Sequence, residues 1–164
     1  MNVNNFRQMY VTELQELRSV EAQLVDALPT MADAASHSEL KQAIQSHLQE
    51  TRSQRDRLDE ILRRHGAEPR EHVDQSMQAI VRESEKWAKM VEEAELRDAG
   101  LIASAQRVEH YEIAVYGTLA TWAKQLGLDE DLRTLLAILE EEKRTDEKLT
   151  DLAKQVVNPD AAST

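Results

Sequence analysis

Residues 101–126, LIASAQRVEHYEIAVYGTLATWAKQL, decide the fold class of this chain. Apolar side chains recur in this stretch at spacings of three and four residues, which is the pattern of a helix that buries one face. Glu112 interrupts the pattern near its middle, and Glu109 lies one turn earlier on the same side. The stretch therefore predicts a buried helix that carries two acidic residues into the interior.

Three further segments, at about residues 10–35, 40–61 and 132–156, show the same spacing and a similar acidic interruption. The expected turns lie near positions 37 and 127, and each helical residue advances about 1.5 Å along the helix axis. Counted from these turns, all the interrupting acids lie at about the same height along the bundle. A carboxylate is costly to bury unless it is paired, so a layer of them predicts a dinuclear metal site inside a four-helix bundle. The six expected ligands are Glu21, Glu50, Glu109, Glu112, Glu142 and Asp146.

The chain of 164 residues contains only four glycines and three prolines, which favours an all-α domain. We expect helices over about 4–35, 38–65 and 98–125 and a fourth from 129. An extra amphipathic helix over about 77–91 lies in the long crossover between the second and third helices. Two antiparallel helical hairpins joined by a long crossover are the ferritin-like form of the four-helix bundle. One domain over 1–157, followed by a flexible tail over 158–164, completes the prediction.

Composition excludes several classes of function. A net charge of -11 argues against nucleic acid or an anionic membrane as a partner. The chain has no cysteine, which excludes disulfides, zinc–thiolate sites and thiol catalysis. No apolar stretch approaches the length of a transmembrane helix or resembles a signal peptide, so a cytoplasmic protein is the expectation.

Three more side chains are expected near the acidic layer. His47 lies one turn before Glu50 and is either a metal ligand, a hydrogen-bond partner of a ligand, or a core histidine. Gln54 is a poor ligand for iron and fits better as a hydrogen-bond donor to a ligating carboxylate. Tyr111 is expected either to hydrogen-bond a ligand or, more simply, to pack with its hydroxyl in water.

The segment Gln106-Arg-Val-Glu-His-Tyr-Glu-Ile-Ala-Val-Tyr-Gly-Thr-Leu resembles the hallmark segment of the YciE/YciF stress-protein family. The resemblance continues through residues 46–51, 97–103 and 140–146 and covers nearly the whole chain. It implies a ferritin-like bundle with a rubrerythrin-type di-metal centre, a homodimer and a connection with stress responses. The wider ferritin-like pattern has histidine three residues after the acid on two helices, where this chain has Ser53 and Thr145.

An oxygen-rich site of this kind suits two ions of iron or manganese. The first hypothesis for function is a stress-related oxidoreductase that acts on iron, peroxide or oxygen. The second is a metal-binding or structural protein without turnover. The third is an interaction protein whose buried acids pair with internal arginines.

Overall fold

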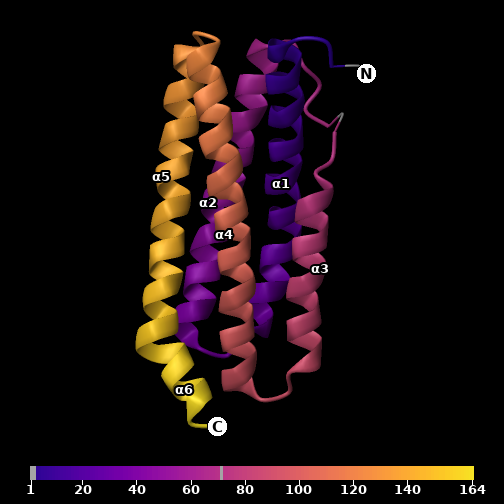
Figure 1. Ribbon diagram of the computed structural model, residues 1–164. Helices are drawn as coiled ribbons and strands as arrows, with labels where there is room; N and C mark the ends of the chain where they lie inside the picture. Colours follow the sequence, from indigo (N-terminus) through magenta and orange to yellow (C-terminus); the bar gives the residue numbers. More distant parts are fainter. Residues whose placement is uncertain (1–2, 71) are drawn as a thin grey trace.

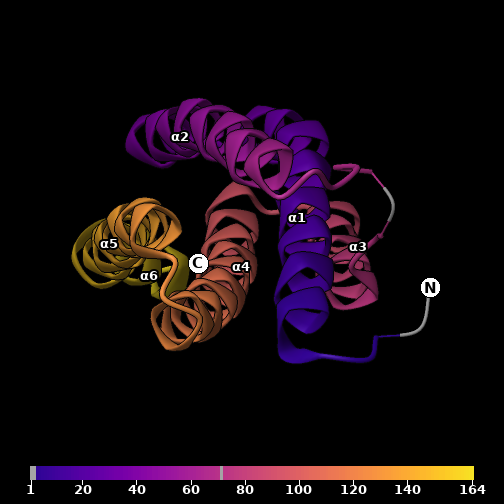
Figure 2. The same cartoon turned by 90° about the horizontal axis from the view of Figure 1, so that it is seen from above.

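The computed structural model describes residues 3–70 and 72–164, and all regular structure in these residues is helical. Four long helices, α1, α2, α4 and α5, form the bundle, and α3 runs along its outside (Figures 1 and 2). The all-α bundle of two hairpins with an extra crossover helix is therefore confirmed. The elements are α1 (Phe6–Ala34), α2 (Ser38–Arg64), α3 (Gln75–Met90), α4 (Ala94–Gln125), α5 (Asp129–Leu152), a π-helical turn (Ala153–Val157) and α6 (Asn158–Ala162).

The hairpins α1–α2 and α4–α5 face each other, with α1 beside α4 and α2 beside α5. The predicted apolar stripes line the space between them, so the bundle has one continuous core. Helix α3 connects the hairpins and covers the outer side of α1 and α4. None of the described helices is long and apolar enough to span a membrane.

Helix boundaries follow local chemistry. The Asn5 side chain accepts a hydrogen bond from the Gln8 backbone and caps the start of α1. Gly66 and Gly127 have φ angles of 66° and 70° just after α2 and α4, where the left-handed conformation favours glycine. Pro29 lies within α1 and does not end it.

Two helix boundaries differ from expectation. Helix α4 begins at Ala94, a turn earlier than predicted, with Glu95 in its first turn. Residues 158–162, expected to belong to a flexible tail, form α6. Pro159 is compatible with this helix because proline lacks only a backbone donor that the first turn leaves unpaired.

Buried aspartates join the helices near both ends of the bundle. At the α1–α2 turn, Asp98 of α4 accepts backbone hydrogen bonds from Ser36 at 2.8 Å and His37 at 2.7 Å. At the opposite end, Asp131 of α5 accepts hydrogen bonds from the Tyr10 hydroxyl at 2.9 Å and from Arg64 at 2.7 Å. These contacts fix the hairpins against each other along the bundle axis and so set the level of the residues between them.

Asp131 also lies 2.6 Å from His65 Nε2. Burial alone would raise the pKa of Asp131, but the hydrogen bonds from His65, Arg64 and Tyr10 together lower it. The aspartate is therefore a buried anion whose partners come from α1 and from the end of α2. It is a stabilising contact of the folded chain rather than an unpaired charge.

Replacing Asp131 by Ala should lower the free energy of unfolding by about 2–4 kcal/mol, because Tyr10 and Arg64 lose a buried acceptor. Urea denaturation followed by circular dichroism measures this change. Asp129→Ala, at an exposed position in the same helical turn, is the control and should cost less than about 1 kcal/mol. Equal effects of the two substitutions would contradict a stabilising role for Asp131.

Candidate metal centre

Four carboxyl side chains meet in the middle of the bundle and are withdrawn from solvent. Glu21, Glu112 and Glu142 are 0% exposed and Glu109 is 1% exposed. Ligand atoms of Glu109, Glu112, Glu142 and His47 lie within 4.8 Å of one another, an arrangement that can hold a metal ion. Glu21 joins this cluster through a contact between its carboxyl group and that of Glu112.

Each main helix contributes to this cluster. Glu21 comes from the middle of α1, His47 from α2, and Glu142 from α5. Helix α4 supplies both Glu109 and Glu112, which lie one turn apart and therefore share a face. The core residues above and below the cluster are apolar, so these side chains have little contact with water.

Burial and mutual repulsion make the charged form of these acids unfavourable. Burial is the main cause that raises the pKa values of Glu21, Glu109 and Glu112 well above the usual range, and the charge of Glu142 adds to it. Burial also raises the pKa of Glu142 to about 7. The cluster therefore needs protons or cations at neutral pH.

His47 completes the cluster as a neutral group, since burial lowers its pKa to about 4. Its Nε2 atom lies 3.2 Å from Glu109 Oε1, yet neither ring nitrogen has the geometry of a hydrogen bond. Both oxygens of Glu109 and of Glu112 also lack a donor. Buried polar atoms normally have partners, so this set of unpaired donor atoms fits a bound cation.

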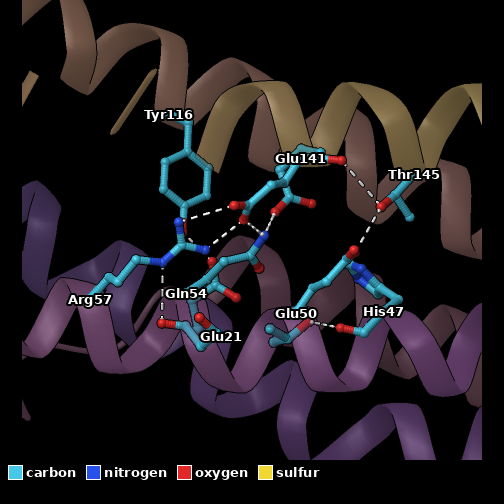
Figure 3. A network of polar contacts seen from close by, with 11 residues as sticks. Glu21, His47, Glu50, Gln54, Arg57, Tyr116, Glu141 and Thr145 are labelled. Carbon is cyan, nitrogen blue, oxygen red and sulfur yellow. Dashed lines mark hydrogen bonds and ion pairs between the residues drawn. The ribbon is translucent and has the colours of Figure 1, made fainter. Parts of the chain in front are cut away.

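Two side chains position the acids through hydrogen bonds. The hydroxyl group of Tyr116, which is fully buried, donates to Glu21. Gln54, also fully buried, donates through Nε2 to Glu142 and, at 3.1 Å, to Glu141. Gln54 thus has the hydrogen-bonding position expected from the sequence (Figure 3).

The arginine nearest this network is paired with a different acid. Arg57 forms two hydrogen bonds with Glu141, at 3.0 Å and 2.5 Å, and these offset the effect of burial and lower the pKa of Glu141. Within residues 3–70 and 72–164, no lysine or arginine forms an ion pair with Glu21, Glu109, Glu112 or Glu142. The hypothesis of acids neutralised by internal arginines therefore lacks the contacts it requires.

Two of the six expected ligands lie outside the cluster. The side chain of Glu50 is exposed, and its Oε2 accepts a hydrogen bond from Thr145 Oγ1 at 3.3 Å. Asp146 is 19% exposed and lies 3.3 Å from His110 Nε2 and 3.4 Å from Gln106 Nε2. On α2, His47, Thr51 and Gln54 lie on the buried face, whereas Glu50 is exposed.

Tyr111 also lies away from the cluster. Its hydroxyl donates to Asp74, the residue that caps α3, and so joins α4 to the crossover. The tyrosine that contacts a cluster acid is Tyr116, one turn after Glu112 on α4, which the sequence did not single out. The pairing of Arg57 with Glu141 was also missed, because the two residues are 84 positions apart and lie on different helices.

The fold and this site define a class of protein, the helical bundle with a candidate metal centre in its core. Comparison with known proteins then gives the family. Residues 5–162 match the family described as "Domain of unknown function (DUF892)", and the chain belongs to this family. The YciF resemblance noted from the sequence is thereby confirmed. Protein YciF of Escherichia coli (strain K12) is 42% identical over 165 residues, which cover 98% of each chain.

Solved structures agree. The E. coli stress protein YciF superimposes with a TM-score of 0.90 at 41% identity, covering 95% of this chain and 99% of YciF. YcfI from Rhodopseudomonas palustris gives a TM-score of 0.88 at 35% identity, with coverage of 91% and 95%. A protein from Xanthomonas campestris pv. campestris shares the fold, with a TM-score of 0.76 at 21% identity.

The raised pKa values predict how the stability of the metal-free protein depends on pH. A carboxyl group whose pKa is raised by folding stabilises the fold below its unfolded pKa, and this contribution is lost as pH rises through the folded value. For Glu142 the window runs from 4.5 to about 7. The raised pKa of Glu142 can change the free energy of unfolding by at most roughly 3 kcal/mol, because each pKa unit corresponds to about 1.4 kcal/mol.

We expect the melting temperature of the chelator-treated protein to decrease as the pH rises from about 5 to about 8. Differential scanning calorimetry measures this slope. In Glu142→Gln the slope should be shallower, because one of the titrating groups is gone. A melting temperature that rises over the same range would contradict the assigned pKa directions.

Proposed function

We propose that this protein is a di-metal carboxylate protein that holds two ions of iron or manganese and acts as a stress-related oxidoreductase on iron, peroxide or oxygen. The observation that carries the proposal is the buried cluster of four acids and one neutral histidine, each of which keeps at least one oxygen or nitrogen atom without a hydrogen-bond partner. Bound iron or manganese would supply the redox chemistry at this site. The structural match to the E. coli stress protein YciF, which covers 95% of this chain, supports the biological setting.

The proposed ligands are Glu21, His47, Glu109, Glu112 and Glu142. Glu109 and Glu112 lie one turn apart, which suits one terminal and one bridging carboxylate. Glu50 and Asp146 remain proposed ligands that would have to rotate inward from the positions described above. The set is mainly oxygen with one imidazole, which suits iron or manganese better than copper or zinc.

The chain's own groups would prepare the site for a cation. Tyr116 and Gln54 hold Glu21 and Glu142 in fixed orientations, and ligand orientation by such partners strengthens metal binding. The acids must release their protons when a cation enters, so metal binding should be accompanied by proton release. Low solvent exposure keeps water from competing for the ligand positions.

A metal-binding role without turnover is the second candidate. The observation that favours it is the absence of histidine at Ser53 and Thr145, the two positions where the wider ferritin-like pattern has one. Metal would then stabilise the bundle or be stored in it. Assays of iron oxidation and peroxide consumption by the loaded protein distinguish the two candidates, because only the first predicts turnover.

The proposal includes two properties of the protein in the cell. A homodimer is expected, and light scattering coupled to size-exclusion chromatography measures its mass. A cytoplasmic location is also expected, and fractionation of cells that express the protein tests it. Neither property is needed for the metal site itself, because its ligands come from one chain.

Protein produced with iron and manganese available should contain two metal ions per chain. The reason is that the buried acids cannot all stay ionised without cations. Elemental analysis after gel filtration provides the measurement. Persistent absence of metal from folded protein would refute the proposed function.

Replacing Glu112 by Ala should abolish binding of at least one metal ion and leave the metal-free bundle folded. With metal present we expect the free energy of unfolding to fall by about 1 kcal/mol or more, because ligand-linked stabilisation is lost. After chelation, stability should be unchanged or higher, since removing a buried acid relieves repulsion and offsets the cavity.

The control is Glu140→Ala, which removes an acid that is 61% exposed on α5. It should leave metal content and stability unchanged in both conditions. If Glu112→Ala is destabilised equally with and without metal, the role of Glu112 is structural and it is not a ligand.

A further inference from the structure

Two residues of metal-binding type lie near the surface between α4 and α5, outside the buried cluster. His110 follows Glu109 directly on α4, and Asp146 lies one turn after Glu142 on α5. The two side chains contact each other, with His110 Nε2 3.3 Å from Asp146 Oδ1. Each of them is therefore next to an acid of the cluster on its own helix.

Solvent exposure falls in steps from this pair to the cluster. The side chain of His110 is 69% exposed, that of Asp146 is 19% exposed and that of Glu109 is 1% exposed. An imidazole nitrogen and a carboxylate oxygen are both donors that iron and manganese accept. The three side chains thus form a series of donor groups that begins in solvent and ends in the core.

The charge of Asp146 acts on the buried cluster. Burial is the main cause that raises the pKa of Glu109, and the charges of Glu142, Glu21 and Asp146 add to it. A cation bound to Asp146 would reverse the last of these effects and favour the ionised form of Glu109. The ionised form is the one that binds metal, so an ion at Asp146 would prepare Glu109 to receive it.

Asp146 is held loosely. Besides His110, its Oδ1 atom contacts Gln106 Nε2, at 3.4 Å, and both distances are long for hydrogen bonds. Within the described ranges 3–70 and 72–164, no lysine or arginine forms an ion pair with Asp146. Its carboxylate therefore keeps its charge and can rotate without breaking a strong contact.

The opposite side of α5 is less favourable for a cation. A pocket between α2 and α5 is lined by Arg144, Lys148 and Glu50, two basic residues and one acid, with a formal sum of +1. Positive charge on a surface lowers the local concentration of cations. The α4–α5 side, with Asp146 and His110, is the side that attracts them.

We propose that His110 and Asp146 form a docking site for a divalent cation, and that Asp146 then passes the cation to Glu109 in the buried cluster. The inference rests on the proposed function, because it gives the entry route of the same metal site. His110 binds the incoming ion through Nε2, and Asp146 rotates from His110 toward Glu109. Two ligands hold an ion more weakly than the larger ligand set of the cluster, so the docked ion moves inward.

Cobalt(II) is a suitable probe, because its visible absorption changes when protein ligands replace water. Chelator-treated protein is mixed with cobalt(II) in a stopped-flow instrument, and the initial rate of uptake and the final cobalt content are both measured. Neither quantity depends on turnover. His110→Ala should slow uptake by about threefold or more and leave the final content unchanged, because His110 takes part in entry and not in storage.

His72→Ala is the control for the loss of a surface histidine. His72 lies in the crossover before α3, and its variant should take up cobalt at the rate of the parent. Equal rates in His110→Ala and the parent would overturn the docking site. A lower final content in His110→Ala would also overturn it, because His110 would then be a ligand of the stored ion.

The charge of Asp146 gives a second test. Asp146→Asn should slow uptake by about tenfold at low ionic strength, and Asp146→Glu, which keeps the charge, should recover most of the rate. Asp151→Asn removes the same charge from an exposed position of α5 that lines the groove toward α2, and it should leave the rate unchanged. Equal slowing by Asp146→Asn and Asp151→Asn would overturn the route, because net charge alone would then set the rate.

The failure of the route is distinguishable from the failure of the proposed function. A parent protein that retains no iron, manganese or cobalt refutes both. A parent protein that takes up cobalt no faster than His110→Ala and Asp146→Asn refutes the route and leaves the metal site standing. Slower uptake in these two variants, full final content in His110→Ala and parental rates in both controls together support the route.

Discussion

The structure depends on the cost of burying acid groups in one layer of the bundle. Glu21, Glu109, Glu112 and Glu142 occupy positions where an apolar side chain would pack without penalty. Their pKa values rise because the folded chain gives them neither water nor a basic partner. Such a layer lowers the stability of the metal-free form, and the same acids are the ligands of the proposed metal site.

The contacts outside the layer offset this cost. Asp131, with partners on α1 and at the end of α2, and Asp98, at the α1–α2 turn, hold the ends of the bundle together by hydrogen bonds that need no metal. Helix α3 adds apolar cover along α1 and α4, and its cap Asp74 binds Tyr111. These contacts lie outside the acidic layer and do not depend on metal. We therefore expect the metal-free chain to remain folded.

The fold and the level of the site were predictable because both follow from helical periodicity and residue counting. What periodicity leaves open is the rotation of each side chain and its partner on another helix. Glu50 and His47 are both near the inner face of α2, yet only His47 reaches the cluster. Glu141 pairs with Arg57 of α2, which is 84 residues away in the chain. Such pairings depend on packing between helices, which a single sequence does not specify.

The hydrogen bond between Tyr10 and Asp131 has a consequence for how the chain folds. It joins residues separated by 121 positions, whereas the helical hairpins need only local contacts. Hairpins of this kind form quickly, and contacts of long sequence separation form slowly because a large loop must close first. Docking of the two hairpins is therefore the step at which the acids lose their water. The rate of folding, and not only the free energy of unfolding, should then depend on those carboxyl groups.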